Sequence, residues 1–288
     1  MHYPPLTAQA LRYLQQLQQR LKASGSERVN TRTKSVQQVL LWCIEHDLVP
    51  GNSLQVPQFT FNLTLLNDIA AVQQRFKQAC FQDDTQHKSR MDNAVNHHQE
   101  LKSIGLKPRQ HRVLLKLNTP ANTGLGVTAE CIDIDWQQLT LSSYDTLLVV
   151  ENLDCFYQLQ RFALELTCQQ PLIIYRGDRL YSKGCTALKA AWLKQHKPAL
   201  YFGDCDAKGL SIALNEGYSA MLLPDLVTLQ QQVSPAMLPD KQLKFIPALK
   251  AKRITHAFTP YLQVVCEQLK GLRQQNMQGM LLNPISVD

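Results

Sequence analysis

The chain has 288 residues, of which 44% are hydrophobic, with a net charge of +7 and a pI near 9.0. It is long enough for two modest domains, and its hydrophobic content is typical of globular rather than disordered proteins. The apolar runs are strand-sized, well below the ~18–20 residues of a membrane span, and the N-terminus lacks the layout of a signal peptide. We therefore expect a cytoplasmic protein without membrane segments.

The positive charge is concentrated in three stretches. Residues 1–44, 86–116 and 241–273 carry net charges of +5, +5 and +6. Such clusters suit a polyanion, because each phosphate that is neutralised releases condensed counterions. One cluster could be a solvated helix face, but three in one chain favour a nucleic acid. We expect double-stranded DNA as a partner.

The first third of the chain predicts a small mixed domain. Three stretches have apolar residues at helical spacing: 7–23, 34–45 and 65–80. Residues 58–62 alternate as a short strand. Helix, helix, strand and helix with basic turns are compatible with an α+β, winged-helix-like DNA-binding region over 1–81. Its candidate DNA-binding residues are Arg28, Arg32 and Lys34.

A connector is expected over 82–143, polar and rich in His and Gln at first, then with strand-like runs at 112–117 and 127–134. Strands and helices alternate after it. The expected strands are 146–150, 172–175, 199–202 and 218–223, and the expected helices are 154–166, 186–196 and 207–216. This alternation predicts a parallel α/β sheet over 144–235. A helical extension is expected over 236–288, with a long amphipathic helix at 255–275.

Three acidic residues follow two of the expected strands. Glu151 ends the first strand, and Asp204 and Asp206 come after the third, in Gly-Asp-Cys-Asp-Ala-Lys-Gly. Functional groups of open parallel sheets gather at the carboxyl ends of the strands, and a spacing of two in extended chain turns both aspartates to one side. The pattern predicts one catalytic and metal-binding centre.

Three converging carboxylates repel one another unless a cation lies between them. Mg²⁺ or Mn²⁺ would relieve the repulsion and could polarise a phosphodiester. The plainer interpretation is that an aspartate caps the next helix and Glu151 pairs with a surface lysine. A lone Asp-x-Asp would favour that interpretation, but the strand-end Glu151 about fifty residues earlier makes the combination more specific.

The Glu-then-Asp-x-Asp arrangement resembles a TOPRIM domain, a Rossmann-like parallel fold found in topoisomerases, primases and several nucleases. Val149-Val-Glu-Asn-Leu, Ile173-Ile-Tyr-Arg-Gly and Tyr201-Phe-Gly-Asp-Cys-Asp-Ala-Lys-Gly-Leu resemble the nuclease subunit of Wadjet-type SMC plasmid-defence systems. More distantly, they resemble the A subunit of topoisomerase VI. The match covers about residues 145–225.

The resemblance implies a metal-dependent DNA endonuclease with a winged-helix arm. Glu151 would be a metal ligand or general acid/base, and Asp204 and Asp206 would be metal ligands. It also implies an SMC-like ATPase and kleisin as partners. The chain departs from the family at Lys208, where relatives commonly have a small residue, Pro or His, and in the loop that starts at Arg176. Four residues near the acids are candidate DNA contacts: Arg176, Arg179, Lys183 and Lys208.

Two alternatives stay open. A catalytically silent DNA-binding subunit would keep the fold, with the Lys208 ammonium in place of a metal. A topoisomerase VI-like subunit would need a nucleophilic tyrosine in the N-terminal region, where Tyr13 is the one candidate because no tyrosine lies between it and Tyr144. A homodimer is compatible with the open edges of the expected sheet.

Overall fold

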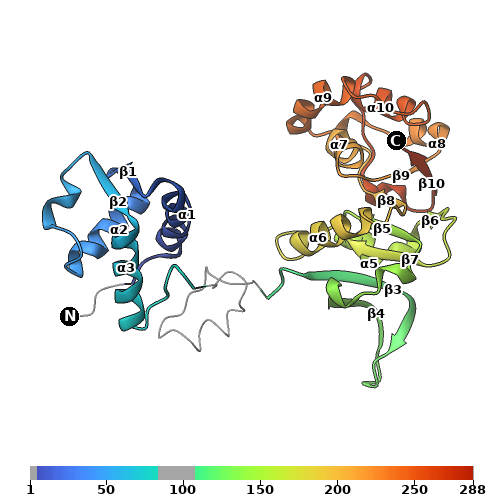
Figure 1. Cartoon of the computed structure of the whole chain (residues 1–288). Helices are drawn as coiled ribbons and strands as arrows, with labels where there is room; N and C mark the ends of the chain where they lie inside the picture. Colours follow the sequence, from blue (N-terminus) through green and yellow to red (C-terminus); the bar gives the residue numbers. More distant parts are fainter. Residues whose placement is uncertain (1–4, 84–107, 288) are drawn as a thin grey trace. The chain divides into compact units, whose positions relative to one another are not determined.

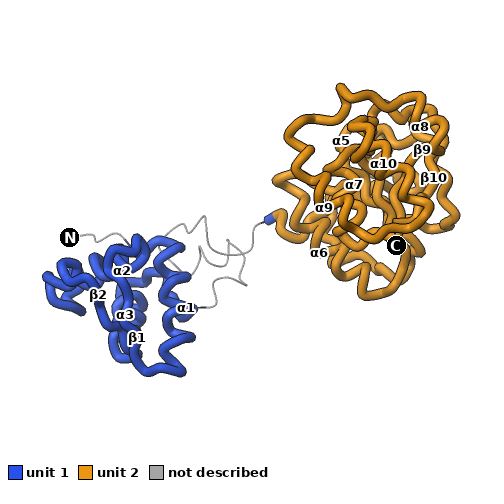
Figure 2. The backbone as a smooth tube through the Cα atoms, turned by 90° about the horizontal axis from the view of Figure 1, so that it is seen from above, with its two compact units in different colours: residues 1–108 blue, residues 109–288 orange. Residues whose placement is uncertain are grey.

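The computed structural model describes residues 5–83 and 108–287, and the chain divides into two compact units, Met1–Pro108 and Arg109–Asp288 (Figures 1 and 2). This boundary differs from the predicted ones. The connector expected over 82–143 is divided, because its strand-like runs belong to the sheet of the second unit. The segment 84–107, which holds the polar part of the connector and much of the second basic cluster, lies outside the described residues.

The described part of the first unit contains three α-helices and a two-stranded sheet. The helices are α1 (Ala8–Ser24), α2 (Lys34–Glu45) and α3 (Leu63–Arg75). β1 (Ser26–Asn30) pairs antiparallel with β2 (Gln58–Asn62), and the apolar faces of the helices close over one core. The three helices and β2 agree with the sequence prediction, except that α3 ends at Arg75, just before Lys77 turns into the left-handed region (φ 50°).

The second unit is built on one eight-stranded sheet, in the order β4-β3-β7-β5-β8-β9-β10-β6. The strands are β3 (Arg112–Asn122), β4 (Thr128–Asp135), β5 (Thr146–Val150), β6 (Ala163–Leu164), β7 (Pro171–Tyr175), β8 (Ala199–Phe202), β9 (Ala220–Pro224) and β10 (Leu281–Ser286). The central four, β7-β5-β8-β9, are parallel. On one side the β3–β4 hairpin runs antiparallel to its neighbours, and on the other β10 is antiparallel to β9 and parallel to the edge strand β6. The predicted α/β class is confirmed.

Helices connect and cover these strands. They are α5 (Leu153–Tyr157), α6 (Ser182–Leu193), α7 (Ala207–Asn215), α8 (Leu226–Gln232), α9 (Ile246–Lys250) and α10 (Thr259–Cys266), with a 3₁₀ segment, η6, at Asp240–Phe245. α7 packs against η6, α9 and α10. Among the described residues, no helix is both long and apolar enough to cross a membrane.

Two helix predictions were wrong in length. The expected helix 154–166 is a single turn, α5, which gives way to a 3₁₀ turn and then to β6. The expected helix 255–275 is only α10, because Leu269 has a positive φ of 54° and the chain after it crosses back to bridge Cys205 with Leu272. In both places apolar residues continue at helical spacing, but they lie in turns and short extended segments rather than along one helix.

The strand order has a switch point between β5 and β8, and we call the carboxyl ends of these two strands, at Val150 and Phe202, the crevice. Of the four parallel strands, β7 follows β5 in the sequence and lies on one side of it, although the chain first passes through β6 at the far edge of the sheet, and β9 follows β8 on the other side. The order of the parallel strands therefore reverses between β5 and β8, and doubly wound sheets bind ligands at the carboxyl ends of strands at such a switch point. All five β5 residues and all four β8 residues are buried, so the sheet holds these two ends rigidly.

Candidate metal centre

The three predicted acidic residues lie at this switch point. Glu151 directly follows β5, and its backbone N–H donates to the carbonyl of Phe202, the last residue of β8. Asp204 and Asp206 follow β8 on the neighbouring strand. The sheet thus brings together the acidic residues that the sequence separates by about fifty positions.

Glu151 is held by a tyrosine from the adjacent strand. The Tyr201 hydroxyl donates to Glu151 Oε2 at 2.6 Å, and the Asp204 backbone N–H lies 3.4 Å from the same oxygen. Gly203 makes this approach possible, because a Cβ there would lie 2.6 Å from Glu151 Oε2 and would also collide with the Tyr201 hydroxyl. Burial and the neighbouring Glu151 raise the pKa of Tyr201 well above its usual value, so it stays a donor.

Asp206 is the cap of α7. Its Oδ1 accepts from the Gly209 N–H at 2.7 Å, the capping bond expected at a helix start. Its Oδ2 accepts from the Gln242 amide at 2.7 Å, and the side chain is almost fully buried. Both oxygens of Asp206 are therefore already bonded within the protein.

Asp204 accepts a hydrogen bond at one of its two carboxylate oxygens. Its Oδ1 accepts from the backbone N–H of Gln274 at 2.7 Å, while the described residues supply no donor to Oδ2. Burial raises the pKa of Asp204 to about 6, and the charges of Asp206 and Glu151 add to the effect. Burial likewise raises the pKa of Asp206. The residues around the three carboxylates therefore offset their negative charge only in part.

We tested whether these side chains suit the divalent cation that the sequence predicts. No three Asp, Glu, His or Cys side chains in the described parts of the chain are close enough to enclose an ion as they stand. Mg²⁺, however, usually keeps several waters and takes one or two carboxylates plus substrate phosphate oxygens. Asp204 Oδ2 and Glu151 Oε1 suit that smaller requirement, because neither oxygen accepts a hydrogen bond from the described residues. Asp206 fits better as a supporting residue than as a ligand.

A lysine already approaches the site. Lys208 Nζ lies 3.8 Å from Glu151 Oε1, and its side chain is 53% exposed. Capping by Asp206 and pairing of Glu151 with a lysine are thus both present, as the plainer interpretation of the sequence expected. Because Lys208 is long and largely solvated, it can leave Glu151 without disturbing the core.

The predicted DNA-binding residues fall into two groups. Arg28, Arg32 and Lys34 are exposed on the first unit, in β1 and the turn into α2. Arg179 and Lys183 are exposed on the second unit, after β7 and at the start of α6.

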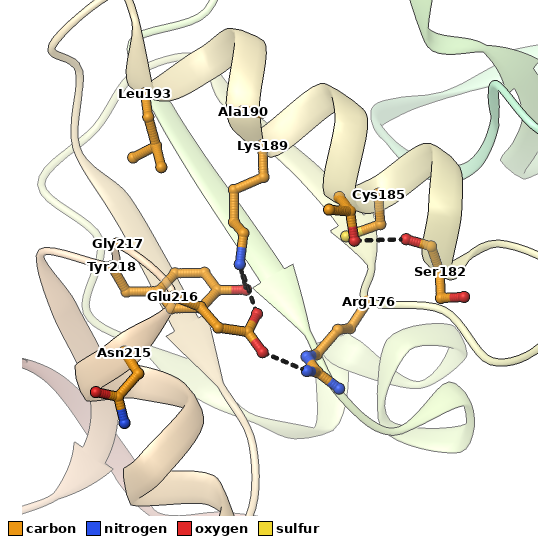
Figure 3. A pocket seen from close by; sticks show the side chains of 11 residues that line it. Arg176, Ser182, Cys185, Lys189, Ala190, Leu193, Asn215, Glu216, Gly217 and Tyr218 are labelled. Atoms are coloured by element: carbon orange, nitrogen blue, oxygen red, sulfur yellow. Dashed lines mark hydrogen bonds and ion pairs between the residues drawn. The ribbon is translucent and has the colours of Figure 1, made fainter. Parts of the chain in front are cut away.

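Arg176 is already engaged in an ion pair. It faces a pocket of about 530 Å³ between α6 and the end of α7 (Figure 3). There, the Glu216 carboxylate forms ion pairs with Arg176 Nη2 at 2.7 Å and with Lys189 Nζ at 2.5 Å. Lys189 Nζ also lies over the ring of Tyr218. Burial alone would raise the pKa of Glu216, but the hydrogen bond from Lys189 and the nearby Arg176 lower it on balance. Arg176 is better explained as part of this internal ion cluster than as a phosphate contact.

The candidate nucleophile of a topoisomerase is poorly placed for attack. The Tyr13 hydroxyl is buried in the first unit and has no hydrogen-bond partner among residues 5–83. Burial also raises its pKa, which disfavours the phenolate.

Three residues at the site were missed by sequence reasoning. Tyr201 lies in an apolar strand, and its hydroxyl signals a partner only once β5 is known to be its neighbour. Gln242 and Gln274 lie 36 and 70 residues after the aspartates that they contact. No local pattern distinguishes them from the many other glutamines of the chain.

Together the fold and the site define an α/β protein with an acidic crevice at the switch point of a mostly parallel sheet. The chain belongs to a family described as a domain of unknown function, DUF7281, whose model matches residues 103–282. The match therefore covers nearly all of the second unit, including the acidic centre. No curated protein matches the chain.

Proposed function

We propose that the protein is a metal-dependent DNA endonuclease that hydrolyses phosphodiester bonds at the crevice between β5 and β8. The observation that carries the proposal is the placement of Glu151 and Asp204 on neighbouring strand ends at the switch point, each with one carboxylate oxygen that accepts no hydrogen bond from the described residues. A bound Mg²⁺ or Mn²⁺ would supply Lewis-acid polarisation of a phosphate and stabilise the leaving oxyanion.

The residues of the chain have distinct parts in this proposal. Glu151 and Asp204 would hold the cation, and Tyr201 keeps Glu151 turned toward it. Asp206 fixes the start of α7 and adds negative charge nearby. In the alternative in which Asp204 alone holds the cation, Glu151 Oε1 would instead accept a proton from the attacking water once Lys208 has moved to a phosphate.

The finer fold assignments belong to the same proposal. We propose a TOPRIM-type domain within the second unit and a winged-helix-like DNA-binding arm in the first. Two observations support these assignments. Acidic residues follow β5 and then β8 in the expected order, and the first unit exposes Arg28, Arg32 and Lys34. An SMC-like ATPase and kleisin are the proposed partners, with double-stranded DNA as substrate, a cytoplasmic location and, as a further option, a homodimer.

A cleavage assay tests the proposal directly. The purified chain with Mg²⁺ or Mn²⁺ should nick or linearise supercoiled plasmid, alone or together with the proposed SMC-like ATPase and kleisin. Chelation, Glu151→Ala or Asp204→Ala should abolish the cleavage. Glu165→Ala, at an exposed glutamate outside the crevice, is the matched control and should cleave normally. Cleavage that survives either crevice substitution would refute the proposal.

A second candidate function is a silent DNA-binding subunit. The Lys208–Glu151 contact favours it, because an ammonium at 3.8 Å offsets part of the negative charge that a metal would otherwise meet. In that case the protein would bind the plasmid but would not cut it, even with its partners present. Lys208→Ala would not produce metal-dependent cleavage either. The buried Tyr13 hydroxyl gives a topoisomerase VI-like mechanism less support than either.

A further inference from the structure

Two buried glutamines reach the acidic centre from distant parts of the chain. Gln274 is fully buried and Gln242 is 7% exposed. An amide that is buried this deeply needs partners for both its donor and its acceptor, because an unsatisfied polar group is costly. The partners of both glutamines are at the metal centre.

Gln274 spans the two strand ends that form the crevice. Its Oε1 accepts from the backbone N–H of Asn152, directly after Glu151, at 3.0 Å. Its Nε2 donates to the carbonyl of Phe202, at the end of β8, at 3.2 Å. Its own backbone N–H donates to Asp204 Oδ1. One residue therefore fixes the end of β5, the end of β8 and the carboxylate of Asp204 relative to one another.

Gln242 does the same for the other aspartate. Its Nε2 donates to Asp206 Oδ2 at 2.7 Å, and its Oε1 accepts from the backbone N–H of Lys208 at 3.0 Å. With the Gly209 bond on Oδ1, Asp206 is fixed at both oxygens. Gln242 thereby joins η6 to the first turn of α7.

The amide is the group that suits this task. It offers a donor and an acceptor on one planar end, which neither Glu nor Met can do. It is also neutral, so it orients a carboxylate without cancelling the charge that a cation needs. Lys or Arg in the same place would fix the geometry but compete with the metal.

We propose that Gln242 and Gln274 are positioning residues that hold Glu151, Asp204 and Asp206 in the arrangement that accepts a divalent cation. This inference rests on the proposed metal-dependent function. Gln274 sets the distance between Glu151 and Asp204 through the two strand ends, and Gln242 keeps Asp206 and the start of α7 in place. Neither side chain would touch the cation itself.

The experiment measures Mn²⁺ affinity by titration calorimetry on the full chain. Gln274→Met and Gln242→Met keep the length and neutrality of the side chain but remove both hydrogen bonds. The matched control is Gln275→Met, at the exposed neighbour of Gln274. We expect about 10–100-fold weaker Mn²⁺ binding in the two buried variants, as for other residues that support metal ligands, and no change in the control. Circular dichroism without metal verifies folding.

A purely structural role would lower the unfolding temperature and leave the Mn²⁺ affinity of the folded protein unchanged. Folded Met variants that bind Mn²⁺ within twofold of the wild type would therefore overturn the inference and leave the proposed function intact. Absence of Mn²⁺ binding by the wild type would overturn both. If a Met variant does not fold, the corresponding Asn variant replaces it, because its amide is neutral but one methylene too short for both partners.

Discussion

The ion cluster around Glu216 can be tested by removing one charge. Glu216→Gln keeps the shape of the side chain but leaves Lys189 and Arg176 without their shared counter-charge. Lys189 has a side chain that is only 10% exposed, so solvent cannot replace the lost partner there. Gln can still accept one hydrogen bond, so what the variant loses is chiefly electrostatic.

The size of the loss follows from burial. Breaking a buried ion pair costs about 3–5 kcal/mol, and an exposed pair contributes about 0–1 kcal/mol. Glu216 is 34% exposed while Lys189 is buried, which places this cluster between the two cases. We expect a loss of about 1–3 kcal/mol, and for a unit of this size about 2–4 °C in unfolding temperature per kcal/mol.

The pH dependence has a definite sign. The folded protein lowers the pKa of Glu216 below its ordinary 4.5, so ionised Glu216 stabilises the fold above that pH. The stabilisation is lost as the pH falls through the folded pKa, because the carboxyl is then neutral. The difference between wild type and variant should be constant at neutral pH and shrink below about pH 4.5.

Urea unfolding followed by tryptophan fluorescence measures the difference. Trp136 and Trp192 report on the second unit, and a Trp42→Phe background removes the signal of the first. Glu267→Gln, at an exposed glutamate of the same unit, is the control. If both Gln variants unfold at the same urea concentration at pH 7, the electrostatic reasoning about the cluster is refuted.

Three further predictions concern the acidic centre. Asp204→Asn should raise the metal-free stability at pH 8 by about 1–3 kcal/mol, because burial raises the pKa of Asp204 to about 6 and the buried charge is present above that pH. The gain should fade toward about pH 4, and urea denaturation at both pH values measures it. Lys208→Ala should lower the Mg²⁺ concentration for half-maximal cleavage a few-fold, by removing a competing ammonium; a metal titration of plasmid cleavage that shows no shift would contradict it. Gly203→Ala should retain the fold but reduce cleavage at least about tenfold, because the new Cβ would displace Glu151 or Tyr201. Unchanged cleavage by a variant with a native circular dichroism spectrum would show that the close approach at Gly203 is dispensable.

The sequence predicts the parallel strands well because each is a short, continuous apolar run. The burial of both faces of β5 and β8 leaves little choice of residue, and the same fact places Glu151 and Asp204 at the strand ends. β1 was not predicted, because it is a polar strand whose structure depends on pairing with β2. Its existence is a tertiary property, and local propensity does not report it.

The supporting residues of the site escape prediction for a related reason. Gln274 follows a turn that ends α10 early, and Leu269 with its positive φ gives no warning of that turn in its chemistry. A glutamine becomes informative only when its two amide partners are known. Sequence patterns therefore locate the charged groups of such a site, while its hydrogen-bonded frame depends on long-range packing.

The energetics of the acidic centre bear on the proposal that it binds a cation. The Lys208–Glu151 pair involves a largely exposed lysine and contributes about 0–1 kcal/mol. Against this, a folded pKa of about 6 for Asp204 instead of the ordinary 3.8 corresponds to about 3 kcal/mol of destabilisation at neutral pH. Capping by Asp206 explains one of the three acids and leaves that imbalance in place. Burial is the main cause of that loss, and buried carboxylates with strongly raised pKa values cluster at functional sites. In the proposed function, a divalent cation beside Asp204 would stabilise its charged form.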